Sequence, residues 1–230
     1  SNSTMAAAVD SCVDLGALHA STGPIGSAVG SALVEINGTS VICAVYGPYV
    51  DARQEFSESG RLSCDVRIAA FARGSDRGRA VSTAADEAQL AQQMHTALSP
   101  AVRLDQYPKS SLQVCAFVHE DNGSLAAALI TCGALALADA AVHMLDLVTA
   151  CNVASVGDKL VAFPSAADEM AAQGVLCIAK LPQVDRVSLL LSEGLHTGRQ
   201  VDYVHAVADA GCAELAKGLR SALLAGHDRR

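Results

Sequence analysis

Residues 30–47 read GSALVEINGTSVICAVYG and consist of two strand-like runs separated by Asn37-Gly38. Asn and Gly tolerate the positive φ angles that the tight turn of a two-residue β-hairpin requires. The flanking runs, 31–36 and 39–46, have the length of ordinary strands. The sequence therefore predicts a β-hairpin here, and this is the strongest local signal in the chain.

The segments after the hairpin predict a strand, a helix and another strand. Residues 61–71 partly alternate between apolar and polar and are expected to form an antiparallel strand that continues a meander. Thr83 and Asp86 resemble a capping box, and apolar residues at helical spacing then predict a helix over 84–98. Residues 112–118 are predicted to be the next strand.

The second half of the chain predicts a buried helix, four strands and a closing helix. Ser124 is expected to cap a helix over 125–142, whose only charge is Asp139 and which should therefore be buried on most sides. Strands are predicted at 147–154, 159–163, 175–181 and 186–191. The closing helix, 201–224, offers an inner face of Val204, Val207, Cys212, Leu215 and Leu219. This order of elements predicts an α+β fold rather than a repeating parallel βαβ one.

The composition describes a folded chain whose core is made of small residues. Of the 230 residues, 51% are hydrophobic, but only 3% are aromatic and none is Trp, so Ala, Val and Leu must fill the core. The length predicts one large domain or two closely packed small ones. The formal net charge of −8 argues against a free-standing, non-specific nucleic-acid binder, because affinity for phosphates comes from Lys and Arg.

The eight Cys lie mainly inside apolar runs, with no Cys-x-x-Cys pair and no zinc-like spacing. They are expected to be buried reduced thiols, which indicates an intracellular compartment. The N-terminus lacks a basic segment followed by a long apolar stretch, and no apolar run predicts a membrane span. We therefore expect a soluble, non-secreted protein without a membrane partner.

No generic catalytic motif is present: the chain has no Walker loop, no dinucleotide-binding fingerprint, no His-Glu-x-x-His and no Gly-x-Ser-x-Gly elbow. His119-Glu120-Asp121 offers three polar groups at a strand end, but neighbours on a strand point to opposite faces. A small-molecule enzyme built on this trio stays an alternative. His95 and His143 are expected to be surface or packing residues. Asp168-Glu169 could serve a metal, but fits a solvated loop or short helix at least as well.

One basic segment stands out from the acidic chain. Five of the 16 basic residues fall within positions 61–79, opposed in that window only by Asp65 and Asp76. Arg73, Arg77 and Arg79 lie in a Gly-rich stretch whose guanidinium groups could reach a phosphate backbone. The alternative interpretation is a solvated loop.

Several separated stretches, in the same order, resemble the RNase PH family. They are the hairpin 30–48, Tyr107-Pro108-Lys109-Ser110, and Glu120-Asp121-Asn122-Gly123-Ser124 leading into 134–140. The resemblance covers about residues 24–224. It implies a fold related to ribosomal protein S5 domain 2, with mixed and antiparallel sheets packed with helices, and assembly into hexameric rings with a central RNA channel.

The resemblance also implies where an active site would lie. Active members cleave RNA from its 3′ end with phosphate as the nucleophile, and they carry Gly, Thr or Ser, Arg, and Thr or Ser at the start of the buried helix. This chain has Gly123-Ser124-Leu125-Ala126. The two aspartates of active members align with Phe163 and Val175. The resemblance thus implies no catalytic residues, metal or cofactor here, and apolar packing at Leu125, Phe163 and Val175.

Among catalytically silent members, the chain is most similar to exosome ring subunits of the mRNA transport regulator (MTR) type, with an RRP-type subunit as the alternative. The finer match lies in 60–72 and 98–104. The resemblance implies a non-catalytic subunit that guides RNA for 3′-to-5′ processing. Its implied partners are RNase PH-like subunits in a hetero-hexameric ring, RNA-binding cap subunits and RNA, in the nucleus, nucleolus and cytoplasm. It also implies that Arg73, Arg77 and Arg79 are candidate contacts for RNA in the channel.

We predict one RNase PH-like domain over residues 24–230, preceded by an N-terminal extension, 1–23, whose residues 1–4 are consistent with a cloning remnant. The competing function is an active phosphate-dependent 3′-to-5′ exoribonuclease, alone or through a composite site shared with a neighbouring subunit.

Overall fold

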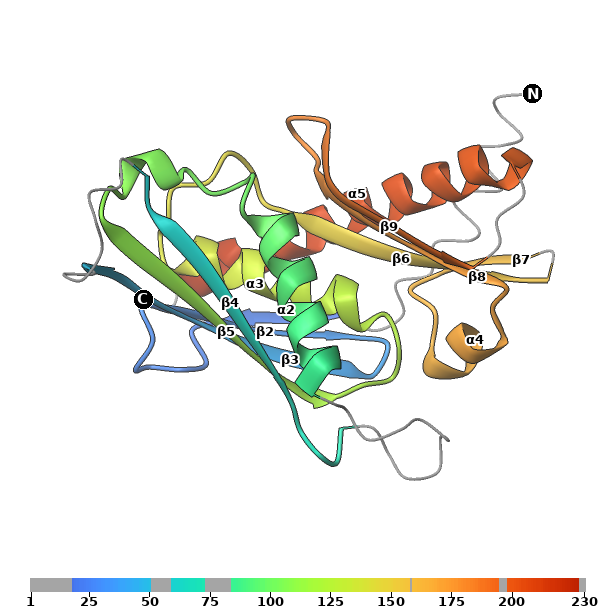
Figure 1. Cartoon of the computed structure of the whole chain (residues 1–230), viewed down its shortest axis with the longest axis horizontal. Helices are drawn as coiled ribbons and strands as arrows, with labels where there is room; N and C mark the ends of the chain where they lie inside the picture. The colour runs from blue at the N-terminus through green and yellow to red at the C-terminus, as the bar shows by residue number, and fades with distance from the viewer. Residues whose placement is uncertain (1–17, 51–58, 73–83, 158, 195–197, 228–230) are drawn as a thin grey trace.

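The protein is described by a computed structural model over residues 18–50, 59–72, 84–157, 159–194 and 198–227 (Figure 1). Two β-sheets enclose helices α2 and α3, and the long helix α5 packs against the second sheet (Figure 1). This arrangement confirms the predicted class, mixed and antiparallel sheets packed with helices.

The first sheet has the strand order β1-β2-β3-β5-β4. Its strands are β1 (Leu18–Thr22), β2 (Gly30–Ile36), β3 (Thr39–Val50), β4 (Arg61–Ile68) and β5 (Ser110–Glu120). The hairpin is confirmed, because β2 and β3 pair antiparallel and φ is 49° at Asn37 and 80° at Gly38. The edge strand β1 pairs antiparallel with β2 and lies within the segment expected to be an N-terminal extension.

The expectation that 61–71 continues the meander as an antiparallel strand is wrong. β4 pairs parallel with β5, and β5 rather than β4 lies beside β3. The reason is the helix between them: α2 (Ala84–Leu98) packs against β4 and carries the chain back to the start of β5. Parallel neighbours need such a crossover, so the fold contains one βαβ unit.

The second sheet is antiparallel throughout, with the order β7-β6-β8-β9. Its strands are β6 (Thr149–Val156), β7 (Lys159–Ala162), β8 (Gly174–Leu181) and β9 (Arg186–Gly194). The four strands predicted in this half are confirmed within a few residues at each end. A short helix, α4 (Ala166–Ala171), connects β7 to β8, and a 3₁₀ turn covers Leu104–Gln106.

Helix α3 (Leu125–Asp139) is buried on nearly every side, as its sequence predicts. It packs against β2 and β3 of the first sheet, against β6 of the second, and against α2. Its Ala and Gly residues leave room for this close approach. The helix ends three residues earlier than predicted, where the Asp139 carboxylate accepts from the Ser31 N–H (3.0 Å) and φ turns to 54° at Ala141.

Helix α5 (Gly198–His227) packs against β6 and β8 and also reaches β1. The predicted inner face is confirmed, since each of its five side chains is at most 1% exposed. The described Cys are all free thiols, and five of them are buried: Cys43, Cys132, Cys151, Cys177 and Cys212. None of the helices in the described ranges combines the length and apolar character that crossing a bilayer requires.

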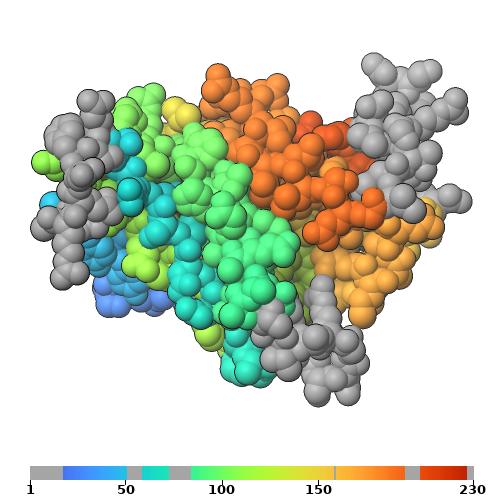
Figure 2. Space-filling view, viewed as in Figure 1, coloured from blue at the N-terminus to red at the C-terminus, as the bar shows by residue number. Residues whose placement is uncertain are grey.

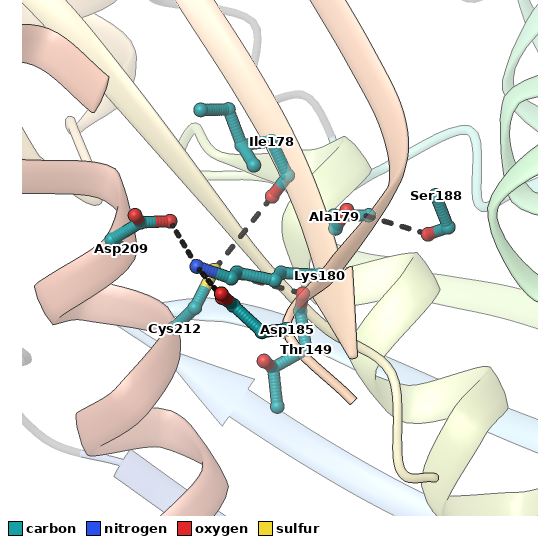
Figure 3. Close-up of polar contacts among 8 residues, drawn as sticks. All are labelled: Thr149, Ile178, Ala179, Lys180, Asp185, Ser188, Asp209 and Cys212. Atoms are coloured by element: carbon teal, nitrogen blue, oxygen red, sulfur yellow. Dashed lines mark hydrogen bonds and ion pairs between the residues drawn. The ribbon is translucent and has the colours of Figure 1, made fainter. Parts of the chain in front are cut away.

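Lys180 joins α5 to the β8–β9 hairpin (Figure 3). Its Nζ lies 2.9 Å from the Asp185 carboxylate in the hairpin turn and 3.0 Å from the Asp209 carboxylate on α5. The Lys180 side chain is only 16% exposed, and the hydrogen bond to Asp185 is the main cause that raises its pKa. Nearby, the Cys212 thiol lies within hydrogen-bonding reach of the Thr149 carbonyl (3.6 Å).

We expect Lys180→Ala to lower the free energy of unfolding by about 1–2 kcal/mol, because it removes two ion pairs and the packing of a mostly buried aliphatic stem. Urea unfolding followed by circular dichroism measures the change. The control is Lys217→Ala, since Lys217 is 70% exposed and pairs only locally with Glu214. That variant should change stability by less than about 0.5 kcal/mol. Equal losses in both variants would contradict a linking role for Lys180.

Candidate functional site

A cavity of about 450 Å³ lies where α3 begins, between α2 and the β8–β9 hairpin. Figure 2 shows α2, in green, beside β9, in orange, on the face that it draws. Leu125 and Ala126 of α3 line the cavity together with Val175 of β8. Three positions that the family resemblance implies for phosphate binding and catalysis are therefore brought together in space.

The turn before α3 is held by hydrogen bonds from several distant segments. The Asn122 N–H donates to the Thr39 hydroxyl (2.8 Å), and that hydroxyl donates to the Gly123 carbonyl (2.6 Å). Gly123 has a φ of 106°, and a Cβ there would lie 2.5 to 2.7 Å from backbone atoms of residues 164–166. Only glycine fits this turn without strain, because L residues with a side chain rarely adopt that φ and the space is filled by backbone.

Ser124 occupies the predicted N-cap position, but its side chain does not cap the helix. Its φ is 53°, and its hydroxyl donates to the Pro164 carbonyl (2.9 Å) instead. The Ser124 N–H donates to the Glu169 carboxylate of α4 (2.8 Å). An internal anion thus sits at the N-terminus of α3, which is where helices ordinarily bind phosphate.

The described lining of the cavity is acidic. It includes four carboxylates, from Asp86, Asp121, Glu169 and Glu193, and neither Lys nor Arg. A phosphate ion is itself an anion and needs cationic or N–H donors, so this lining opposes its binding. Burial raises the pKa of the Cys177 thiol in the same lining to about 12, so it stays protonated near neutral pH and offers no thiolate nucleophile.

Comparison with known proteins shows the family of the chain. A profile of the 3′ exoribonuclease family (RNase PH, domain 1) matches residues 14–143. The chain belongs to the RNase PH family. It is 36% identical to human exosome complex component MTR3 over 93% of this chain and 84% of the relative. Its fold resembles that of rice Rrp46, with a TM-score of 0.78, 18% identity, and coverage of 91% of this chain and 96% of that one. It also resembles the Archaeoglobus fulgidus exosome with RNA bound to the active site, with a TM-score of 0.76, 19% identity and 89% of each chain covered.

Phe163 stands apart from Leu125 and Val175, the other positions that the family resemblance implies, because it does not line the cavity. It is 1% exposed and its N–H donates to the Asn152 carbonyl (2.8 Å). A Cβ placed on Gly211 would lie 3.3 Å from the Phe163 ring, so the ring packs toward α5. The expectation of apolar packing at this position is confirmed, but the packing belongs to the core beneath α5 and not to the cavity.

The trio His119-Glu120-Asp121 does not converge, as strand geometry predicts. Asp121 is buried and lines the cavity, whereas His119 and Glu120 are exposed and do not. The His119 ring instead makes an edge contact with Phe71 at 5.4 Å. Within the described ranges, no group of His, Cys, Asp and Glu is arranged to hold a metal ion.

The structure also shows where the other two histidines and the Asp168-Glu169 pair lie. His95 is half-buried on α2, and exposed His143 lies 6.3 Å from the Tyr107 ring, as expected of surface or packing residues. Asp168 forms a capping box with Ser165 at the start of α4, which confirms the short-helix interpretation. Its neighbour Glu169 reaches the cavity, a role that the sequence analysis missed.

The basic window is only partly described. Arg61 is exposed at the start of β4, and Arg67 pairs with Asp65 (3.5 Å) and with Glu87 of α2 (3.3 Å). The sequence window did not reveal Glu87, because that residue lies beyond it and is brought there by the crossover helix. The three candidate RNA contacts, Arg73, Arg77 and Arg79, lie outside the described residues.

Proposed function

We propose that this chain is a non-catalytic ring subunit of an RNA exosome, of the MTR type, which helps form the channel that guides RNA toward a 3′-to-5′ nuclease elsewhere in the complex. Its membership of the RNase PH family and its 36% identity to an exosome component support the assembly. Its fold, shared with rice Rrp46 and with a chain of the Archaeoglobus fulgidus exosome, is consistent with it. The proposed sites of action are the nucleus, nucleolus and cytoplasm.

The proposal that the subunit is non-catalytic rests on the residues that line the cavity. Phosphorolysis brings a phosphate ion against a phosphodiester, so two anions must be held together by cationic groups or a metal. Here Leu125, Ala126 and Val175 supply apolar surface, and Glu169 already binds the N–H of Ser124. These groups oppose the reaction on this chain alone. The described part of the lining supplies no Lys or Arg to a composite site.

The proposed partners follow from the same family. Other RNase PH-like chains would complete a hetero-hexameric ring, and RNA-binding cap subunits would sit on one of its faces. The chain's net charge of −8 is compatible with RNA in a shared channel, because a ring subunit needs only a local basic edge. Arg73, Arg77 and Arg79 are the proposed phosphate contacts.

We expect the triple change of Arg73, Arg77 and Arg79 to Glu, introduced into the assembled ring, to weaken binding of single-stranded RNA by at least about tenfold. The slope of log affinity against log salt should fall by about two, since each lost phosphate contact removes about 0.7. Filter binding at several salt concentrations measures both quantities.

The matched control replaces three exposed cations elsewhere, Lys159, Arg186 and Lys217, with Glu. It changes the net charge by the same amount, so it separates a local RNA path from general repulsion. Gel filtration shows that both variants still assemble. Unchanged affinity in the Arg variant, or an equal loss in the control, would remove these arginines from the RNA path.

A further inference from the structure

Asn152 on β6 leaves a buried hydrogen-bond acceptor unused at the cavity where α3 begins. Its side chain lines the cavity, the residue is 5% exposed, and its Oδ1 makes no hydrogen bond with any of the described residues. Buried side-chain acceptors are ordinarily satisfied, because an unmade hydrogen bond leaves the cost of desolvation unopposed. Asn152 therefore indicates a place for a hydrogen-bond donor that the described part of the chain does not supply.

The pairing of the second sheet places the Asn152 side chain on the cavity side. Its neighbour Cys151 faces α5, where a Cβ on Gly211 would lie 2.7 Å from the sulfur, and successive side chains on a strand point to opposite faces. Asn152 pairs with Cys177 of β8, which pairs with Leu191 of β9, and all three residues line the cavity. They form a row across three strands that spans about 10 Å, because directly opposite side chains lie about 5 Å apart.

Aliphatic side chains from four elements also line the cavity: Leu90 of α2, Leu125 of α3, Val175 of β8 and Leu191 of β9. They suit a ligand with an apolar body. Cys177, beside Asn152, adds a sulfur atom, and sulfur makes favourable contacts with aromatic rings. The volume of about 450 Å³ lies in the range of ordinary ligand pockets. The walls therefore favour a flat aromatic group that carries a donor.

The carboxylates of the lining bear on the charge of the ligand. Asp86, Asp121 and Glu169 all interact with other groups of the chain, so the ligand need not bring a positive charge to them. For Asp121 and Glu169 the partners include backbone N–H groups at the start of α3, at 3.2 and 2.8 Å. The negative charges oppose an anion such as a nucleotide, and ionised carboxylates donate no hydrogen bond to acceptors on a ligand. An uncharged ring with a donor and no acceptor fits best.

We propose that this cavity binds the indole ring of a tryptophan from a protein partner, with the indole N–H donating to Oδ1 of Asn152. Indole has one N–H donor, no acceptor and a large apolar body. The chain itself contains no Trp, so the ring must come from another molecule. One wall, β9, is the edge strand of its sheet, and a segment of the partner can pair with its backbone. The proposal concerns the ligand of the cavity and does not depend on membership of an exosome.

The test uses the full chain and a blocked tripeptide, acetyl-Gly-Trp-Gly-amide. Because the chain has no Trp, tryptophan fluorescence reports the peptide alone, and its anisotropy measures binding. The matched peptide carries 1-methyltryptophan, which keeps the ring and removes the donor. We expect the methylated peptide to bind at least about fivefold more weakly, since the Asn152 oxygen then stays buried without a donor. Equal binding of the two peptides, or no binding of either at millimolar concentration, would overturn the proposal.

A protein variant shows which acceptor the ring uses. Asn152→Leu replaces the amide with an apolar side chain of similar size, so it should lose most of the preference for the unmethylated peptide. The control, Gln92→Leu, changes an exposed amide on α2 that does not line the cavity, and it should keep the preference. An undiminished preference in Asn152→Leu would contradict the assignment. Circular dichroism shows whether each variant folds, and if Asn152→Leu does not, the two peptides on the unaltered chain decide alone.

Calorimetric titration with two further ligands decides the source of the ring. Free indole should bind at least about tenfold more weakly than the Trp peptide, because it has no backbone to pair with β9. Adenosine monophosphate should bind more weakly still, because the lining is negatively charged. Indole that binds as tightly as the peptide would overturn the protein partner in favour of a small molecule. Adenosine monophosphate that binds more tightly than the peptide would overturn the proposal in favour of a nucleotide.

Discussion

Purified chain incubated with inorganic phosphate and poly(A) should release nucleoside diphosphates at least about 10⁴-fold more slowly than an active RNase PH-family enzyme. Loss of one preorganised donor typically costs about 10²- to 10³-fold in rate, and the family resemblance implies that Leu125, Phe163 and Val175 stand in place of an Arg and two aspartates here. The effects of groups that act together are not additive, so the expected loss is smaller than the product of the single losses.

The geometry adds a reason beyond the missing groups. The Glu169 carboxylate accepts from the Ser124 N–H at the start of α3, so phosphate would have to displace this carboxylate and enter a cavity whose described lining is acidic. Chromatographic detection of nucleoside diphosphates measures the rate, with an active relative and a reaction without phosphate as controls. Phosphate-dependent release within about tenfold of the active relative would contradict a silent subunit.

We expect Phe163→Ala to lower the free energy of unfolding by about 3–5 kcal/mol, as is typical when a fully buried aromatic side chain is removed. Phe163 is 1% exposed and its ring lies beside Gly211 of α5, so truncation leaves a cavity between that helix and the second sheet. Urea unfolding followed by circular dichroism measures the loss.

The chain offers a matched control for this variant in Phe117→Ala. Phe117 lies on β5 and is 42% exposed, so the same truncation there should cost less than about 1 kcal/mol. A loss at Phe163 no larger than that at Phe117 would contradict the conclusion that Phe163 is part of the core.

Local patterns predicted the elements whose structure is decided locally. Asn37-Gly38 fixed the hairpin through its positive φ angles, and the apolar run from Leu125 predicted a helix that is in fact buried between two sheets. The inner face of α5 followed from helical spacing alone. For α5, the periodicity of the apolar residues matches the face that the fold buries.

The sequence-based predictions were wrong where the pairing of distant strands decides the structure. Residues 61–68 have the alternation of a strand, but alternation does not say whether the neighbour runs parallel or antiparallel, and the crossover through α2 made β4 parallel to β5. The strand β1 was missed because Leu18–Thr22 is short and is held by its pairing with β2.

The candidate site was predictable in part. The family resemblance located Leu125 and Val175, which do line one cavity, but it also suggested Phe163, which lies beneath α5. The acidic character of the lining could not be read from the sequence, because its carboxylates come from separate elements. Glu169 illustrates the difficulty: the capping box beside it explained the acid pair as an ordinary helix start.

The most direct test of the central proposal is native mass spectrometry of the complex that co-purifies with the tagged full-length chain from its own cells. We predict an assembly in which one copy of this chain accompanies other RNase PH-like subunits of a hetero-hexameric ring, together with RNA-binding cap subunits. Recovery of the chain alone, or as a ring made only of its own copies, would contradict the account.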